Sequence, residues 1–201
     1  MTKKASKSNA SKSNASKSNV SKSNVSGRRK ISDNPEVIKV SRPKMPKSYG
    51  IKESKNPEDY RPWSYLEKRM KEARNYWVAT SRPDGRPHVM PVWGIWVEGR
   101  FYFGTASDSR KARNLAENPA IAVHLESGDD VIILEGVVEQ RMPDEVLREK
   151  MNAESLAKYQ MPLMLPPGAA MYMLKPRVAF AWSESNFSKT ATRWILDLEA
   201  A

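Results

Sequence analysis

The sequence contains no cysteine and only two histidines, His88 and His124, among its 201 residues. The absence of cysteine excludes disulfides, thiolate chemistry and cysteine metal sites, and two histidines are too few for a histidine-rich metal site. The chain shows no Ser–His–Asp arrangement, no Rossmann glycine fingerprint and no Walker loop. If the protein is an enzyme, a cofactor must carry the chemistry, so we assign no catalytic side chain and no metal ligand.

Long apolar runs are also missing. The N-terminus is basic but lacks the apolar core of a signal peptide. No stretch approaches the roughly 20 apolar residues that a membrane span requires. We therefore predict a soluble, cytoplasmic protein that does not insert into a membrane.

Positive charge is abundant, but it is confined to one part of the chain. Residues 1–56 hold 15 of the 34 Lys and Arg and 3 of the 23 Asp and Glu, which gives a net charge of +12. Residues 57–201 hold the remainder and carry a net charge of −1. The overall charge of +11 is therefore no argument that the folded part binds nucleic acid.

Residues 6–25 are four copies of a pentamer, SKSNA twice and SKSNV twice. A period of five fits neither a helix face nor a strand face, and Ser and Asn disfavour helix interiors. We predict that residues 1–56 form a disordered basic tail and linker, and that residues 57–201 form one domain. An alternative role for the tail is electrostatic contact with nucleic acid or another anionic surface.

The domain reads as strands joined by turns, with helices between them. Ser64-Tyr-Leu-Glu67 matches a capping box and predicts a helix that runs to about Asn75. A second helix is predicted over residues 144–159, with Val146, Leu147, Met151 and Leu156 toward the core. The turns at Asp84-Gly85 and Glu98-Gly99 join strands as hairpins. Six or seven strands, nearly all antiparallel, favour a mainly β fold, a barrel with flanking helices.

The stretch TASDSRKARNLAENP, residues 105–119, is the first candidate site. Asp108 or Ser109 can cap a helix that Pro119 ends. The free N–H groups at such a helix start bind anions, and arginine grips phosphate with two parallel bonds. The three cations Arg110, Lys111 and Arg113 are therefore either a phosphate clamp or a solvated helix start.

The strand HVMPVW, residues 88–93, is the second candidate. Proline removes a donor from a β-ladder, so Pro91 belongs at an edge or a bulge. Trp93 and Trp96 are three residues apart, so strand alternation places them on opposite faces. The strand either lines a flat ligand or is a barrel strand with aromatic core residues. His88 is expected to be structural or at the rim, and His124 is assigned no role.

The runs WSYLEKRMKEARNYWVATSRPDGRPHVMPVWGIW and FYFGTASDSRKARNLAENPAIAVHLESGDDVIILEGVVE resemble the pyridoxamine 5′-phosphate oxidase-like split β-barrel superfamily. Within that superfamily, the chain most resembles the flavin/deazaflavin oxidoreductases, and PRVAFAW and ATRW are similar to this group's C-terminal end. The resemblance covers about residues 61–194. It implies an FMN-binding-like split barrel and a homodimer with flavin-type cofactors at the subunit interface.

The resemblance also implies roles for particular residues. Thr105, Ser109, Arg110 and Lys111 match the motif that holds the cofactor phosphate, and Asn114 follows on the same helix. The strand that runs along the cofactor ring is matched by Met90, Pro91, Val92 and Trp93. Arg193 and Trp194 are implied to contribute from the C-terminal strand, either of the same chain or of the partner subunit.

The resemblance implies hydride transfer between a bound cofactor and a small organic substrate. The cofactor is FMN or the deazaflavin coenzyme F-420, and the HVMPVWG pattern resembles the deazaflavin branch. One alternative is a non-catalytic protein of the same fold that binds a flavin or haem. The other is an authentic pyridoxamine 5′-phosphate oxidase. This second alternative is disfavoured because the chain ends in RWILDLEAA, without the R-L-x-P segment of those enzymes.

Overall fold

The structure is a computed structural model that describes residues 37–196. The SKSN repeats, with the rest of residues 1–36, lie outside the described residues, as do residues 197–201. The predictions about the basic tail therefore concern a part of the chain that the structure does not describe. None of the helices within residues 37–196 is long and apolar enough to cross a membrane.

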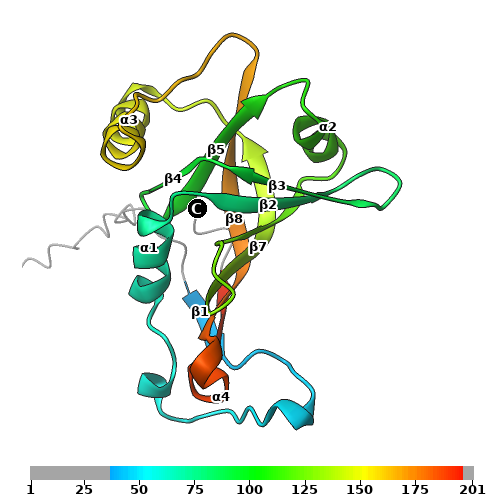
Figure 1. The fold of residues 1–201 in the computed structure, drawn as a ribbon, viewed down its shortest axis with the longest axis vertical. Coiled ribbons are helices and arrows are strands. Elements are labelled where there is room, and N and C mark those ends of the chain that lie inside the picture. The colour runs from blue at the N-terminus through cyan, green and yellow to red at the C-terminus, as the bar shows by residue number, and fades with distance from the viewer. Residues whose placement is uncertain (1–36, 197–201) are drawn as a thin grey trace, which may run out of the picture. The chain divides into compact units, whose positions relative to one another are not determined.

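The described chain forms a mainly antiparallel β-structure with flanking helices, as the sequence predicts (Figure 1). Its strands are β1 (Val37–Ser41), β2 (Tyr76–Ser81), β3 (Pro87–Val92), β4 (Gly94–Val97), β5 (Arg100–Ala106), β6 (Ala120–His124), β7 (Asp130–Gln140), β8 (Ala169–Ser183) and β9 (Thr192–Leu196). Its α-helices are α1 (Trp63–Glu72), α2 (Arg110–Glu117), α3 (Glu145–Tyr159) and α4 (Phe187–Thr190).

The long strand β8 changes its neighbours along its length, and this splits the sheet into the two parts of the barrel. Residues 169–173 of β8 pair with β5, whereas residues 178–181 pair with β9. On its other edge β8 pairs with β7 almost from end to end. The strand order is β1-β9-β8-β7-β6-β2-β3, with β4 attached through β5. The expected split β-barrel is therefore the observed fold.

Two strands differ from the sequence-based expectation. The run HVMPVWGIWVEG, which lies between the two predicted hairpin turns and so reads as one strand, breaks at Trp93 into β3 and β4, and these two strands pair with different partners. Strand β1 lies inside the segment that the sequence analysis assigns to the linker, and it pairs with β9. Strand β1 is only five residues long and is followed by Pro- and Lys-rich sequence. It therefore shows too little alternation of apolar and polar residues to be recognised as a strand from the sequence.

Helix α1 does not begin with the predicted capping box. It starts at Trp63, one residue before Ser64, and its N-cap is Pro62, which makes no side-chain cap bond. Proline with a fixed φ is compatible with a helix start, so the helix forms without the predicted serine cap. Leu66 and Met70 then face the core, and both are fully buried.

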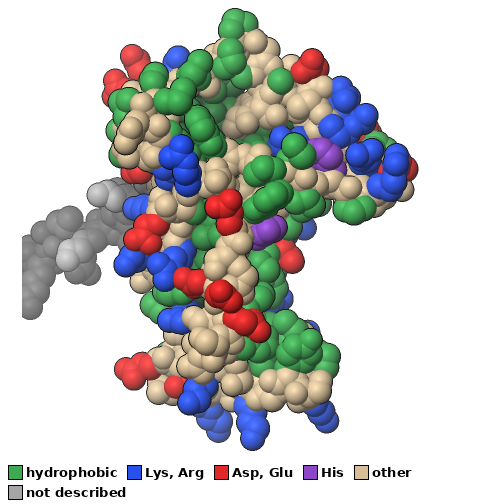
Figure 2. All heavy atoms as spheres, in the orientation of Figure 1, with side chains coloured by type: hydrophobic (Ala, Val, Ile, Leu, Met, Phe, Trp, Pro, Cys, Tyr) green, Lys and Arg blue, Asp and Glu red, His purple; other side chains and the backbone are tan. Residues whose placement is uncertain are grey.

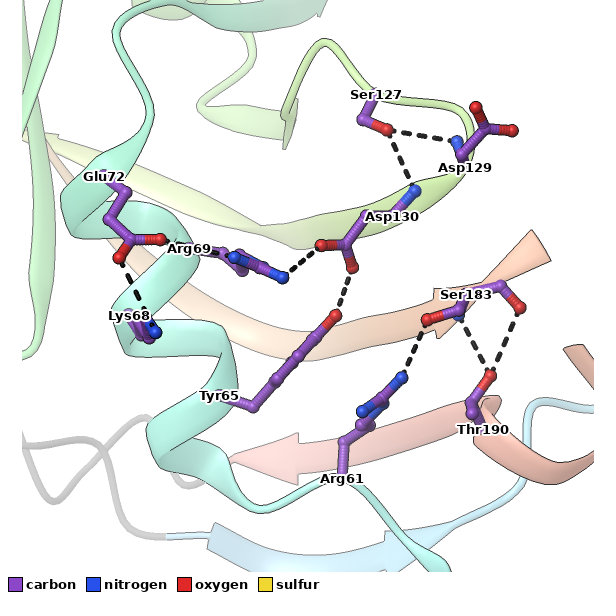
Figure 3. Close-up of polar contacts among 10 residues, drawn as sticks. All are labelled: Arg61, Tyr65, Lys68, Arg69, Glu72, Ser127, Asp129, Asp130, Ser183 and Thr190. Carbon is purple, nitrogen blue, oxygen red and sulfur yellow. Dashed lines mark hydrogen bonds and ion pairs between the residues drawn. The ribbon is translucent and has the colours of Figure 1, made fainter. Parts of the chain in front are cut away.

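A network of polar contacts ties α1 to the sheet (Figure 3). The Tyr65 hydroxyl donates to the Asp130 carboxylate on β7, and the Arg69 guanidinium lies 2.7 Å from the other oxygen of that carboxylate. The Tyr65 ring lies between two guanidinium groups, those of Arg61 at 4.4 Å and Arg69 at 5.1 Å. Arg61 also donates to the Ser183 hydroxyl at 2.7 Å. These contacts fix α1 across the ends of β7 and β8.

Helix α3 starts as predicted, with Asp144 as its N-cap and the Asp144 carboxylate accepting from the Leu147 N–H at 2.9 Å. The core face is narrower than expected. Leu147 and Met151 are buried, but Val146 is 62% exposed and Leu156 is 47% exposed, so placing these two toward the core was wrong. The strand with which α3 makes most of its contacts is β4. Because one strand covers only a narrow stripe of a helix surface, Val146 and Leu156 stay outside that contact.

Candidate functional site

The start of α2 carries the most unusual group of polar side chains. Ser109 is the N-cap, and its hydroxyl oxygen accepts from the Ala112 N–H at 3.1 Å, as one of the two sequence-based alternatives predicted. The same oxygen accepts a hydrogen bond from the Thr105 hydroxyl at 3.1 Å. The Lys111 ammonium donates to Thr105 at 3.5 Å. No hydrogen bond within residues 37–196 uses the Ser109 hydroxyl proton, which remains available to an external acceptor.

Lys111 is a buried cation that has no ion-pair partner among residues 37–196. Its side chain is only 8% exposed, and burial lowers its pKa. None of the ion pairs between described residues involves Lys111, Arg110 or Arg113. A buried charge is costly unless it is paired, so this lysine suits a site that receives an anion.

More positive charge surrounds Lys111. Burial lowers the pKa of His88, and the charges of Arg82, Lys111 and Arg110 lower it further. Figure 2 shows Lys and Arg side chains gathered around a His side chain, over the β2–β3 hairpin and α2. The carboxylate of Asp84 in this hairpin is occupied by Arg86, with an oxygen–nitrogen distance of 2.6 Å. The electrostatic potential at the start of α2 is therefore positive.

A cavity of about 490 Å³ opens beside this group of cations. Its walls are residues 91–95 at the β3–β4 junction, residues 102–106 of β5, and the connecting segment 161–169. Lys111 and Thr105 lie in its wall, and side chains of α3 and β8 complete it: Met151, Ser155, Tyr159 and Met171. This size and mainly apolar lining, with a few polar groups on one side, are typical of a small-molecule site.

Trp93 and Tyr159 form an aromatic wall of the cavity. Their rings stack with centroids 4.7 Å apart and an interplanar angle of 13°, and the Arg74 guanidinium lies 5.9 Å from the centre of the Trp93 ring. Trp93 is 49% exposed while Trp96 is buried, but Trp93 lies at the break between β3 and β4, so the predicted strand alternation does not relate the two residues. The exposed face of Trp93 is available to a flat ligand.

The Tyr159 hydroxyl fixes the junction between β3 and β4. It accepts from the Gly94 N–H at 2.9 Å, and it lies 2.8 Å from the carbonyl oxygens of both Gly94 and Arg74. Because a phenol has one proton, it donates to one of these carbonyls at a time. Burial raises the pKa of Tyr159 and keeps this hydroxyl protonated.

Lys158, the neighbour of Tyr159, contacts the core from the last turn of α3. Its ammonium donates to the Tyr76 hydroxyl at 2.7 Å and lies 5.1 Å from the centre of the Tyr76 ring. Burial lowers the pKa of Lys158 to about 8, against a smaller opposing effect of Glu154. Burial also raises the pKa of Tyr76. The lysine charge is therefore a cost to the folded state near neutral pH.

We predict that Lys158→Met stabilises the protein at about pH 7, and that this advantage shrinks as the pH rises from about 8 toward about 9.5. Over that interval the unfolded lysine still binds its proton and the folded one has lost it, so the wild type gains stability. After allowance for solvent screening, the free energy of unfolding of Lys158→Met should exceed that of the wild type by about 1 kcal/mol at neutral pH. Urea unfolding at several pH values measures it. Lys68→Met, on the exposed face of α1, is the control, and its difference from the wild type in unfolding free energy should not depend on pH. If this difference varies with pH in the same way for both variants, the prediction is wrong.

The structure brings only some of the predicted site residues together. Pro91, Val92, Trp93, Thr105 and Lys111 line the cavity. Ser109 is hydrogen-bonded to one of them, and Arg110 is exposed at the same helix start. Met90 is 46% exposed on the edge strand β3 and does not line the cavity.

The remaining predicted residues lie elsewhere in the chain. Asn114 is fully buried, and its amide donates to the Thr80 hydroxyl at 2.9 Å, which ties α2 to β2. Trp194 is buried against Trp63, with ring centroids 5.6 Å apart. Neither Trp194 nor its neighbour Arg193 lines the cavity of its own chain.

Sequence reasoning missed the α3 side of the site. Met151, Ser155 and Tyr159 have the helical spacing of core residues, and nothing in that spacing distinguishes a cavity wall from a packed core. The segment 161–169, which contains the Pro-rich run LMLPPG, matches no motif of a binding site. The one usable signal was the concentration of methionine and leucine in MPLMLPPG, which exceeds what a solvated loop requires.

The family model for pyridoxamine 5′-phosphate oxidase matches residues 65–183. The chain belongs to this family. No curated protein matches it. Among solved structures, a conserved hypothetical protein from Mycobacterium tuberculosis is 22% identical, with a TM-score of 0.55, over 65% of this chain and 89% of that one. At this identity the likeness shows a shared fold.

Two further solved structures are more distant in shape. An F-420 reductase is 27% identical with a TM-score of 0.45, over 56% of this chain and 94% of the other. A haem-binding protein from Mycobacterium smegmatis is 16% identical with a TM-score of 0.47, over 65% of this chain and 62% of the other.

Proposed function

We propose that this protein is an oxidoreductase that binds a flavin or deazaflavin and transfers a hydride between it and a small organic substrate. The observation that carries the proposal is Lys111, a buried cation without a carboxylate partner among the described residues, at the polar end of an apolar cavity. Family membership supports the choice of cofactor class.

The donor set at the start of α2 fits a phosphate group. Lys111 supplies charge, the Ser109 proton is free, and the first N–H groups of α2 lie at the positive end of the helix. Arg110, exposed beside them, can contribute a second cation. We assign the phosphate-binding role to Thr105, Ser109, Arg110 and Lys111, while Asn114 positions the helix through Thr80.

The apolar part of the cavity fits a flat ring. Backbone and side chains of residues 91–93 form one wall, where Trp93 offers its exposed face. The methionine and leucine side chains of segment 161–169 line another wall of the cavity. When bound, a flavin or deazaflavin supplies the hydride chemistry. The chain itself binds, orients and shields the reacting groups.

We further propose that the protein is a homodimer with the cofactor near the interface. Strand β3 is the edge of the sheet, and Val89, Met90 and Trp93 on or beside it are all more than 40% exposed. An unpaired edge strand with exposed apolar side chains favours association with another chain. In this arrangement Met90 lies at the interface, and Arg193 of one chain is the residue proposed to approach the partner's site. Trp194, which is 1% exposed and packed against Trp63, supports β9 from the core and has no exposed surface to offer a partner.

The cavity lining contains no carboxylate and no histidine among the described residues, which keeps non-catalytic binding as the second candidate. Under hydride transfer, solvent or the Tyr159 and Lys111 side chains are the nearby sources of a proton. Reduction and reoxidation of the bound cofactor, followed by stopped-flow absorbance with candidate substrates, separate an enzyme from a carrier. Turnover supports the first proposal, and binding without turnover supports the second.

The decisive experiment is absorbance and fluorescence titration of the purified full chain with FMN and with coenzyme F-420. We expect binding at micromolar concentration or tighter for one of them, and the F-420 arm tests the preference indicated by the HVMPVWG pattern. Light scattering on the same samples should give twice the chain mass. Failure of both cofactors to bind would reject the proposed function.

A further inference from the structure

His88 lies next to the proposed phosphate site. It is half-buried on β3, directly opposite Thr80 of β2 in the strand register. Its ring nitrogen Nδ1 is 3.5 Å from the Thr80 hydroxyl. That hydroxyl accepts from the Asn114 amide on α2, three residues beyond Lys111. One shared hydroxyl therefore connects the His88 ring to the helix that presents the anion-binding groups.

The charged groups that bear on His88 are all cations. Arg82, at the end of β2, and Arg110 and Lys111, on α2, act on it, and no carboxylate of the described chain does. Asp84 in the same hairpin is held by Arg86. The Arg82 Nε is itself buried without an acceptor among the described residues. Burial lowers the pKa of His88 most, and the positive charges of this cluster lower it further, so both favour the neutral ring in the free protein.

We propose that His88 is a further binding group of the anion site, and that it takes up a proton when the phosphate monoester of FMN or the phosphodiester of coenzyme F-420 binds there. The proposal rests on the proposed function, because it uses the same site. An anion among Lys111, Arg110 and Arg82 cancels the repulsion that helps to keep His88 neutral and adds an attraction for its protonated form. The imidazolium then becomes a donor and a counter-charge to the ligand.

The sign of the pH dependence follows from this coupling. The complex binds more protons than the free protein plus ligand, so affinity rises as the pH falls through the interval in which bound His88 is protonated and free His88 is not. The phosphate monoester loses its second charge below about pH 6, which opposes the effect there. The increase in affinity should therefore lie between about pH 8 and about pH 6.

The chain offers a clean test because it has only two histidines. We would follow their Cε1–H resonances by NMR against pH in the full chain, free and saturated with FMN or coenzyme F-420, and assign them with His124→Gln. The His88 curve should move to higher pH in the complex. The His124 resonance, from β6 on the other side of β2 from β3, is the internal reference. Riboflavin, which lacks the phosphate, should leave the His88 curve unchanged where it binds.

Calorimetry at about pH 7.5 in two buffers of different ionisation heat provides the second measurement. Binding to the wild type and to His124→Gln should take up a fraction of a proton, and binding to His88→Gln should take up none. The His88→Gln variant should bind about tenfold more weakly than the wild type at about pH 6.5, and nearly equally at about pH 8.5. A constant ratio across pH, or an unchanged His88 curve with the cofactor bound, overturns this inference alone. No binding of either cofactor overturns it together with the proposed function.

Discussion

Replacing Lys111 by methionine should weaken cofactor binding and, in the same variant, stabilise the free protein. The two effects have one cause. The Lys111 ammonium is buried with a single long hydrogen bond, to Thr105, and without a carboxylate among the described residues. Its charge therefore costs the free protein stability and is offset only when an anion binds. Methionine keeps the volume and the flexible stem and removes that charge.

The expected size of the binding effect is large. Loss of a charge-assisted hydrogen bond costs about 1.5–3 kcal/mol, which is about 10- to 150-fold in the dissociation constant. Adding Arg110→Ala should increase the loss if both cations contact the phosphate. The free protein should gain about 1 kcal/mol in urea unfolding. Riboflavin isolates the phosphate, because its affinity should change far less than that of FMN.

Arg113→Met is the matched control for this variant. It removes one positive charge from the same helix, but the Arg113 side chain is exposed and donates to the Asp108 carbonyl. It should change cofactor affinity only slightly and should bring no gain in stability. If Lys111→Met binds the cofactor as tightly as the wild type, or unfolds at a lower urea concentration, the Lys111 charge does not serve to bind an anion.

The sequence predicted the cap and the helix at the proposed anion-binding end of the cavity, because the signals for these elements are local. A serine before a helix, cations in the first turn and a proline after the last turn are all read within about fifteen residues, and Ser109 and α2 follow them. That Lys111 is buried and Arg110 exposed was not visible in the sequence. Their burial depends on which strand the helix packs against, and this is set by contacts with β2 and β5.

The cavity itself could not be predicted, because its walls come together from distant parts of the chain. Tyr159 reaches Gly94 and Arg74 across 65 and 85 residues, so no local pattern links them. The capping box predicted at Ser64 was wrong for a different reason. There a local motif was present in the sequence, but tertiary packing determined where the helix starts. Trp63 is held against Trp194, and the helix begins one residue earlier than its apparent cap.

Gly94→Ala should be the most destabilising small substitution near the cavity. A Cβ at this position would lie 2.2 Å from Cε2 of Phe101 and 3.0 Å from the Tyr102 carbonyl oxygen. Phe101 cannot swing aside, because it is fully buried between Tyr76, at 4.5 Å, and Phe103, at 5.8 Å between ring centroids. Strand β4 must therefore move away from β5, and it takes with it the backbone that Tyr159 holds.

The expected cost is about 2–4 kcal/mol, since overpacking a rigid core and disturbing a buried hydrogen-bond junction act together. For a chain of this size it lowers the melting temperature by about 5–10 °C. Gly104→Ala is the control on the neighbouring strand: its Cβ would meet Met171 Cε at 3.7 Å and the Ala170 carbonyl at 3.9 Å, which are ordinary contacts. Thermal unfolding should leave that variant close to the wild type. Equal melting temperatures for the two glycine variants would mean that the β3–β4 junction yields easily, and Trp93 would then not be a fixed wall for a cofactor ring.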